Sequence, residues 1–170
     1  MRSIDVRDLL ASPGAAKTIH VGETVPGLHT ELAAVPEDAP IEGDLTLESM
    51  VEGIYVHGSV AGRFSMRCAR CLKEFRRDFD VAMDELYVRE PGPEDDYAVD
   101  PDLTLDPEPM VRDAVVLEMP FSPLCRPDCL GLCPVCGGDR NLGECPGHAA
   151  TDPRWAALEG LFDRTDDPTT

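Results

Sequence analysis

Apolar and polar residues alternate along residues 54–68, in the middle of the 170-residue chain. The even positions of this stretch are mostly apolar and the odd positions mostly polar. A period of two predicts a strand with one buried face. A second alternating run covers residues 75–84, so we predict a β-hairpin with Cys68 and Cys71 at its tip.

Shorter apolar runs predict the other elements. Further strands are expected at residues 3–6, 18–21 and 44–52, between turns rich in proline and glycine. A helix is expected from Asp106, a good N-cap, with Pro107 in its first turn. Its apolar face would carry Met110, Ala114, Val115 and Met119. A second short helix is expected near the end of the chain, with one face formed by Trp155, Leu158 and Phe162.

These elements predict an α+β protein, built mainly from an antiparallel β-sheet or small barrel with two short helices. Residues 1–120 would form the β-rich body, which carries the hairpin and an acidic, proline-rich mobile loop at residues 89–106. Residues 121–164 would form a cysteine-rich, zinc-binding segment and the C-terminal helix, packed on the body. Residues 165–170 are expected to be a disordered tail.

No stretch approaches the roughly twenty apolar residues of a membrane span, and the first residues lack the apolar core of a secretory signal. We therefore expect a cytoplasmic protein without a membrane partner. In that reducing compartment clustered cysteines are expected to bind metal rather than to form disulfides.

The formal net charge of -18 argues against a protein that coats nucleic acid by bulk attraction. One local strip beside the first cysteine pair is basic instead, and it could contact RNA phosphate or an acidic partner. The strip consists of Arg63, Arg67, Arg70, Lys73, Arg76 and Arg77. The alternative is a solvated sheet face that balances its acidic neighbours.

Cysteine spacing is the strongest chemical signal in the chain. Seven cysteines and one histidine provide eight ligands of the kind that Zn(II) prefers, enough for one or two structural ions. These candidate ligands are Cys68, Cys71, Cys125, Cys129, Cys133, Cys136, Cys145 and His148.

Two ways of sharing these ligands are compatible with their spacing. In the first, the ligands from Cys133 to His148 form one local site, while Cys68 and Cys71 join Cys125 and Cys129 in a second. In the other, both Cys-x-x-Cys pairs share one ribbon-like site and the remaining ligands are spare. Spacing alone leaves both open.

A site with four protein ligands has no position for substrate or activated water, so it stabilises a fold without catalysing a reaction. The chain also lacks a P-loop, a dinucleotide-binding glycine motif and a nucleophile elbow. We therefore expect a protein that is not an enzyme and has no small-molecule substrate.

Several stretches together carry a family resemblance. They are Cys-Ala-Arg-Cys-Leu at 68–72, residues 105–123 followed by Leu124 and Cys125, the run 129–137 with Asn141, and Asp-Pro-Arg-Trp at 152–155. Together they resemble the YceD family, bacterial and chloroplast proteins linked to accumulation of large-subunit ribosomal RNA. Family members often end the cluster with Cys-x-Cys, whereas this chain has Cys145-Pro-Gly-His148, which leaves the role of His148 open.

The resemblance implies a zinc-binding factor for biogenesis of the large ribosomal subunit. Its partner would be large-subunit ribosomal RNA, a pre-ribosomal particle or a basic ribosomal protein. A redox- or zinc-responsive regulatory protein that binds a protein partner is the alternative, and a purely structural interaction module is a third.

Overall fold

The computed structural model describes residues 1–94 and 96–148, and the expected C-terminal helix and tail lie outside these residues. The elements in chain order are β1 (Ile4–Asp5), α1 (Arg7–Leu10), β2 (Ala16–Glu23), β3 (Ala33–Ala34), β4 (Ile41–Ser49), β5 (Gly53–Arg67), β6 (Glu74–Val88), β7 (Thr104–Leu105) and α2 (Glu108–Glu118).

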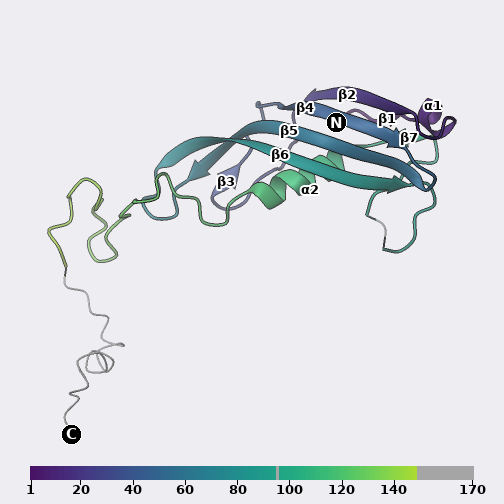
Figure 1. Cartoon of the computed structure of the whole chain (residues 1–170). Helices are drawn as coiled ribbons and strands as arrows, with labels where there is room; N and C mark the ends of the chain where they lie inside the picture. Colours follow the sequence, from purple (N-terminus) through teal and green to yellow (C-terminus); the bar gives the residue numbers. More distant parts are fainter. Residues whose placement is uncertain (95, 149–170) are drawn as a thin grey trace, which may run out of the picture.

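The predicted hairpin is confirmed and provides the two longest strands of the sheet (Figure 1). β5 and β6 pair over their full lengths, from Gly53 opposite Val88 to Arg67 opposite Glu74. β4 and the short β3 share the other edge of β5, and β2 pairs with β4. All pairs are antiparallel and both sheets are open, so the barrel alternative is wrong and the antiparallel sheet is right.

The alternation of the sequence appears as two different faces of this sheet. On β5 the apolar even positions are buried, including Ile54, Val56, Phe64 and Met66. α2 lies along this inner face and packs its own apolar side against it (Figure 1). The buried side chains of α2 are Met110, Val111 and Val115. This packing makes one hydrophobic core from the sheet and the helix.

The start of α2 is close to the predicted one. The helix begins one residue later, with Pro107 rather than Asp106 at the N-cap, and the Asp106 carboxylate accepts a hydrogen bond of 2.9 Å from the Glu108 N–H. The helix ends at Glu118, just before Pro120.

The acidic segment expected as a mobile loop contains anchored residues. Thr104 and Leu105 form β7, which pairs with β1 as a two-stranded sheet. Val99 and Leu105 are buried in the core. The sequence pattern did not predict this anchoring because isolated apolar residues between acids show no period. In the described part of the chain no helix is long and apolar enough to cross a membrane.

Candidate metal centres

The tip of the β5–β6 hairpin carries Cys68 and Cys71. Two backbone hydrogen bonds shape the turn: the Cys68 N–H donates to the Lys73 carbonyl, and the Leu72 N–H donates to the Cys68 carbonyl, both at 2.9 Å. Leu72 has a φ of 60°, in the left-handed region that side chains rarely occupy. The tight turn brings both sulfurs to one side of the loop.

The second Cys-x-x-Cys pair lies in the same kind of turn. The Cys133 N–H donates to the Gly138 carbonyl at 2.9 Å, and the Gly137 N–H donates to the Cys133 carbonyl at 2.8 Å. Gly137 has a φ of 75°. The offsets along the chain are the same as in the hairpin tip, so the repeated spacing folds into a repeated structure.

The first ligand group, which we call the clamp cluster, consists of Cys68, Cys71, Cys125 and Cys129. All four sulfurs lie within 4.8 Å of one another. The Cys68 and Cys129 sulfurs are 3.8 Å apart, and those of Cys71 and Cys125 are 3.6 Å apart. Zinc–sulfur bonds of about 2.3 Å in a tetrahedron place sulfurs about 3.8 Å apart, so the geometry fits a metal ion.

The second group, the terminal cluster, consists of Cys133, Cys136, Cys145 and His148. Their ligand atoms also lie within 4.8 Å of one another. Cys136 and His148 are exposed and Cys145 is half-buried, whereas three of the four clamp ligands are buried. His148 thus occupies the place of the last ligand, although the family's usual Cys-x-Cys ending is absent.

The first of the two pairings is therefore the one that the structure forms. Each cluster brings together four side chains that could hold a metal ion, and all seven cysteines are free thiols. The ribbon-like site, which would join both Cys-x-x-Cys pairs, does not form.

A family model described as "Large ribosomal RNA subunit accumulation protein YceD" matches residues 56–162, a range that includes both clusters. The chain belongs to the YceD family. It is similar to the uncharacterized protein Rv2926c of Mycobacterium tuberculosis, with 41% identity over 92% of this chain and 79% of that protein. It is 35% identical to the uncharacterized protein ML1660 of Mycobacterium leprae, over 93% of this chain and 76% of that one.

A more distant relative is the uncharacterized protein YlbN of Bacillus subtilis, which is 28% identical over 64% of this chain and 66% of that protein. No solved structure matches the chain at a significant level.

Backbone contacts hold the clamp cluster against the hairpin. The Ala69 N–H donates to the Pro123 carbonyl at 2.8 Å, and the Leu132 N–H donates to the Arg70 carbonyl at 2.9 Å. The Arg70 guanidinium donates in return to the Cys129 carbonyl at 2.9 Å. The cysteine-rich segment thus packs on the hairpin tip from both sides of the clamp ligands.

The thiols of the clamp cluster have divided pKa values. Burial acts to raise the pKa of Cys68, but hydrogen bonds from the backbone N–H groups of Cys125, Cys71 and Arg70 outweigh it and lower that pKa to about 6. Burial raises the pKa of Cys125 to about 12, and its hydrogen bond with Cys71 adds to the increase.

In the terminal cluster, too, one thiol has a lowered pKa and another a raised pKa. Backbone N–H groups of Cys136 and Val135 lower the pKa of Cys133 to about 6. The pKa of Cys145 is raised, because its contact with Cys133 and partial burial outweigh a hydrogen bond from the Gly147 backbone. Cys68 and Cys133 therefore ionise readily, whereas the raised pKa values of Cys71, Cys125 and Cys145 keep protons that a metal ion would displace.

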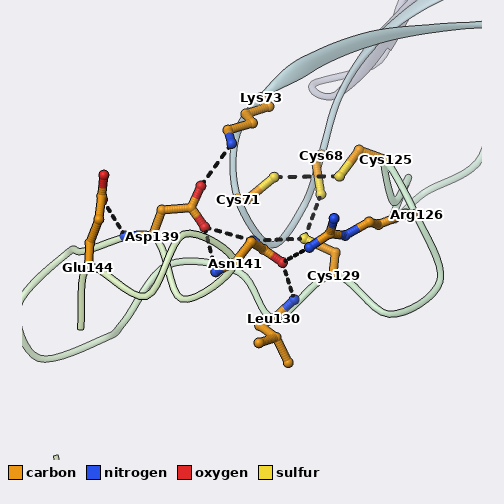
Figure 2. A network of polar contacts seen from close by, with 10 residues as sticks. All are labelled: Cys68, Cys71, Lys73, Cys125, Arg126, Cys129, Leu130, Asp139, Asn141 and Glu144. Carbon is orange, nitrogen blue, oxygen red and sulfur yellow. Dashed lines mark hydrogen bonds and ion pairs between the residues drawn. The ribbon is translucent and has the colours of Figure 1, made fainter. Parts of the chain in front are cut away.

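Asn141 and Asp139 connect the two halves of the clamp (Figure 2). The Asn141 amide oxygen accepts from the Leu130 N–H and from Arg126, both at 2.8 Å. Its amide nitrogen donates to the Cys129 sulfur at 3.6 Å and to the Asp139 carboxylate at 2.7 Å. The Asn141 amide thus orients the candidate ligand Cys129, as polar residues around metal sites commonly do for the ligands they contact.

Asp139 extends this network to the hairpin. Its side chain is only 8% exposed and forms an ion pair of 2.9 Å with Lys73. Lys73, followed by Asn141, lowers the pKa of the Asp139 carboxyl to about 2. Sequence reasoning missed Asp139, because an acid between glycine and arginine resembles any loop residue. Asn141 was visible only as part of the family motif.

The basic strip is divided by the structure. Arg63 forms an ion pair of 2.6 Å with Asp78, and Arg67 lies 3.9 Å from Glu74. Arg70 and Lys73 are engaged in the clamp contacts described above. For the remaining two, Arg76 and Arg77, the described residues provide no ion-pair or hydrogen-bond partner. β-Register places these two on opposite faces of β6, so the strip is not one continuous surface.

Proposed function

We propose that this protein is a non-enzymatic, zinc-binding factor that supports accumulation of large-subunit ribosomal RNA and biogenesis of the large ribosomal subunit. The observation that carries the proposal is membership of a family described by this role, through a match that includes both ligand clusters. A cytoplasmic location goes with it. The physical part of the proposal is that zinc holds the cysteine-rich segment against the hairpin.

Zinc is the proposed metal because of the donor set. One cluster offers four thiolates and the other offers three thiolates and an imidazole. Soft sulfur and imidazole donors in a tetrahedron favour zinc over hard ions such as magnesium or calcium. Four protein ligands in each cluster leave no coordination position for substrate, which is why we propose structural sites without catalysis. Metal analysis of purified protein should find two zinc ions per chain.

Depletion of the protein in its own cells tests the functional part. Large-subunit ribosomal RNA should fall relative to small-subunit RNA, and sucrose gradients should show incomplete large subunits. Wild-type protein should restore the ratio, whereas a variant that cannot form the clamp, Cys68→Ser with Cys71→Ser, should not. An unchanged RNA ratio after full depletion would reject the proposal.

Arg76 and Arg77 are the proposed contact for RNA phosphate, because the other four basic residues of the strip have acidic or backbone partners. Arg76→Glu with Arg77→Glu should abolish cosedimentation with precursor particles and preserve the zinc content. The matched control is Arg2→Glu with Lys17→Glu, two exposed cations outside the hairpin for which the described residues also provide no ion-pair partner. Cosedimentation that survives the first pair of changes would sink this assignment.

The exposure of Cys136 and His148 favours a second candidate, a redox- or zinc-responsive regulator. Such a protein should lose zinc readily and reversibly on mild peroxide treatment. Its depletion should leave the ratio of the two ribosomal RNAs unchanged, which separates the two candidates.

A further inference from the structure

β6 has one free edge in the part of the chain that the structure describes. Its other edge pairs with β5 along the whole strand. Four backbone hydrogen bonds show the direction in which these residues point. Lys73 and Arg89 each bond towards the β5 side, whereas Val88 bonds outward to both Tyr97 and Val99. Backbone groups alternate in direction along an antiparallel strand, so the even positions from Arg76 to Leu86 point their N–H and C=O groups away from β5.

The chain itself already uses the end of this edge. The Val88 N–H donates to the Tyr97 carbonyl at 3.2 Å, and the Val88 carbonyl accepts from the Val99 N–H at 2.9 Å. Residues 97–99 thus lie beside β6 as a short piece of added strand, with Ala98 bridged to Val88. Beyond Val88, towards the hairpin tip, no described segment continues this pairing.

A groove runs beside the free part of the edge, between β6 and α2, with a volume of about 370 Å³. Its floor is apolar, and Leu117 of α2 is 86% exposed there. Its polar lining is acidic and comprises Asp84, Glu85, Asp113 and Glu118. On the outer face of β6 the even positions nearer the hairpin tip are Ala82, the acidic Asp80, the Asp78 that pairs with Arg63, and the basic Arg76.

We propose that this edge binds an extended, lysine- or arginine-rich peptide segment of a partner protein, which adds to β6 as a further strand. Outward backbone groups would supply the main-chain hydrogen bonds, and alternate side chains would give specificity. Side chains that face inward would be apolar and cover the groove beside Leu117. Those that face outward would be basic and lie near Asp80 and Asp84.

Charge decides between this occupant and a second copy of the chain. Two β6 edges placed together would bring aspartates against aspartates, which is unfavourable for opposed residues on neighbouring strands. A basic segment turns the same charges into an attraction. The proposal does not depend on the metal clusters or on the role in ribosomal RNA accumulation, because it uses only the body.

A fluorescent peptide of alternating lysine and valine, blocked at both ends, is a suitable probe for the full-length protein with its metal. Binding should raise fluorescence anisotropy and slow amide hydrogen exchange at Asp80, Ala82 and Asp84. Ala82→Pro removes one outward N–H and should weaken binding by roughly tenfold or more, since proline cannot donate to a ladder.

Ala16→Pro is the matched control, an exposed alanine on β2 at the opposite edge of the sheet. The Ser49 N–H donates to the Ala15 carbonyl, so Ala16 also points its N–H away from the neighbouring strand. Its binding should equal that of the wild type. Equal affinity of Ala82→Pro and wild type would overturn the proposal by showing diffuse attraction only.

Two measurements keep the test independent of the folding of any variant. A peptide methylated on all its backbone nitrogens should lose binding to wild-type protein, and one with glutamate in place of lysine should also fail. Undiminished binding by the methylated peptide rejects strand addition. A wild-type protein that sediments as a dimer, with Ala82→Pro a monomer, would assign the edge to a second copy and reject the basic partner.

Discussion

The clamp cluster and the terminal cluster are built on the same turn and have different surroundings. The clamp joins chain segments 54 to 61 residues apart, as the Cys71–Cys125 and Cys68–Cys129 contacts show. The terminal cluster takes all its ligands from residues 133–148 and leaves two of them exposed. The same turn therefore has two uses. In the clamp cluster it joins the hairpin to the cysteine-rich segment, and in the terminal cluster it shapes a surface loop.

Removing one ligand from each cluster should have its largest effect at the clamp. Cys129→Ser should lose one of two zinc ions and release residues 124–148 to protease, while the sheet keeps its strand signal in circular dichroism. The body has its own hydrophobic core, whereas the proposed zinc ions are what would hold the segment in place. Structural zinc contributes roughly 10 to 16 kcal/mol of apparent folding free energy in small modules.

Cys136→Ser is the matched variant for the terminal cluster. It should also lose one zinc ion, but new cleavage should be confined to the residues after Cys133. Equal cleavage patterns for the two variants would show that the clusters are not different in kind.

The zinc affinities of the two clusters should also depend differently on pH. Raised pKa values keep Cys71 and Cys125 of the clamp protonated near neutral pH, so zinc must displace at least two protons there. In the terminal cluster Cys145 must lose at least one. Acid favours the protonated, metal-free form, so affinity falls as pH falls. For each pH unit of acidification between about pH 8 and 6.5, the zinc affinity of the clamp should fall at least about 100-fold and that of the terminal cluster at least about tenfold.

Competition with a coloured zinc chelator measures both slopes. Cys136→Ser isolates the clamp, and Cys129→Ser isolates the terminal cluster. Below about pH 6 the readily ionised thiols, Cys68 and Cys133, should add one further proton to each slope. Equal slopes for the two variants would contradict the division of pKa values.

The sequence predicts the parts of this comparison that depend on local order. Alternation places Cys68 and Cys71 at a hairpin tip, because a half-buried strand needs a period of two. Ligand pairing could not be predicted, since both arrangements satisfy the spacing and only the docking of Leu132 and Pro123 on the hairpin decides between them. β7 was missed for a similar reason: two residues show no period, and its partner β1 is distant in sequence.

Among the described residues, the Asn141 side chain contacts a ligand sulfur of the clamp cluster and none of the terminal cluster. Asn141→Ala removes the donor to the Cys129 sulfur and leaves the Leu130 N–H without its acceptor. Loss of such a neighbour typically lowers metal affinity by about 10- to 100-fold, and we expect that range for the clamp alone. Competition with a zinc chelator, with Asn141→Ala added to Cys136→Ser and to Cys129→Ser, measures the change in zinc affinity of each cluster.

Arg140→Ala is the control for this change, because the backbone N–H of Arg140 bonds to Gly131 while its side chain is exposed. It should leave both affinities unchanged. An equal loss in both clusters after Asn141→Ala would mean that the network stabilises the whole segment and does not act through Cys129.

The smallest expected difference comes from one backbone angle. Leu72 and Gly137 occupy the same position of the two turns, with φ values of 60° and 75°. A residue with a Cβ costs roughly 1 to 2 kcal/mol in this region, whereas glycine occupies it freely. Gly137→Ala should therefore weaken zinc binding at the terminal cluster by about tenfold, and nothing lies within 4 Å of the added Cβ to cause a clash. Leu72→Gly should strengthen the clamp by less than the full cost, because glycine also has more freedom to lose on folding. Zinc affinities that change in opposite directions in the two variants would show that the two turns are equivalent and that buried contacts compensate for the strain in the clamp. A weaker zinc affinity of the clamp after Leu72→Gly would show instead that the leucine side chain itself contributes to the turn.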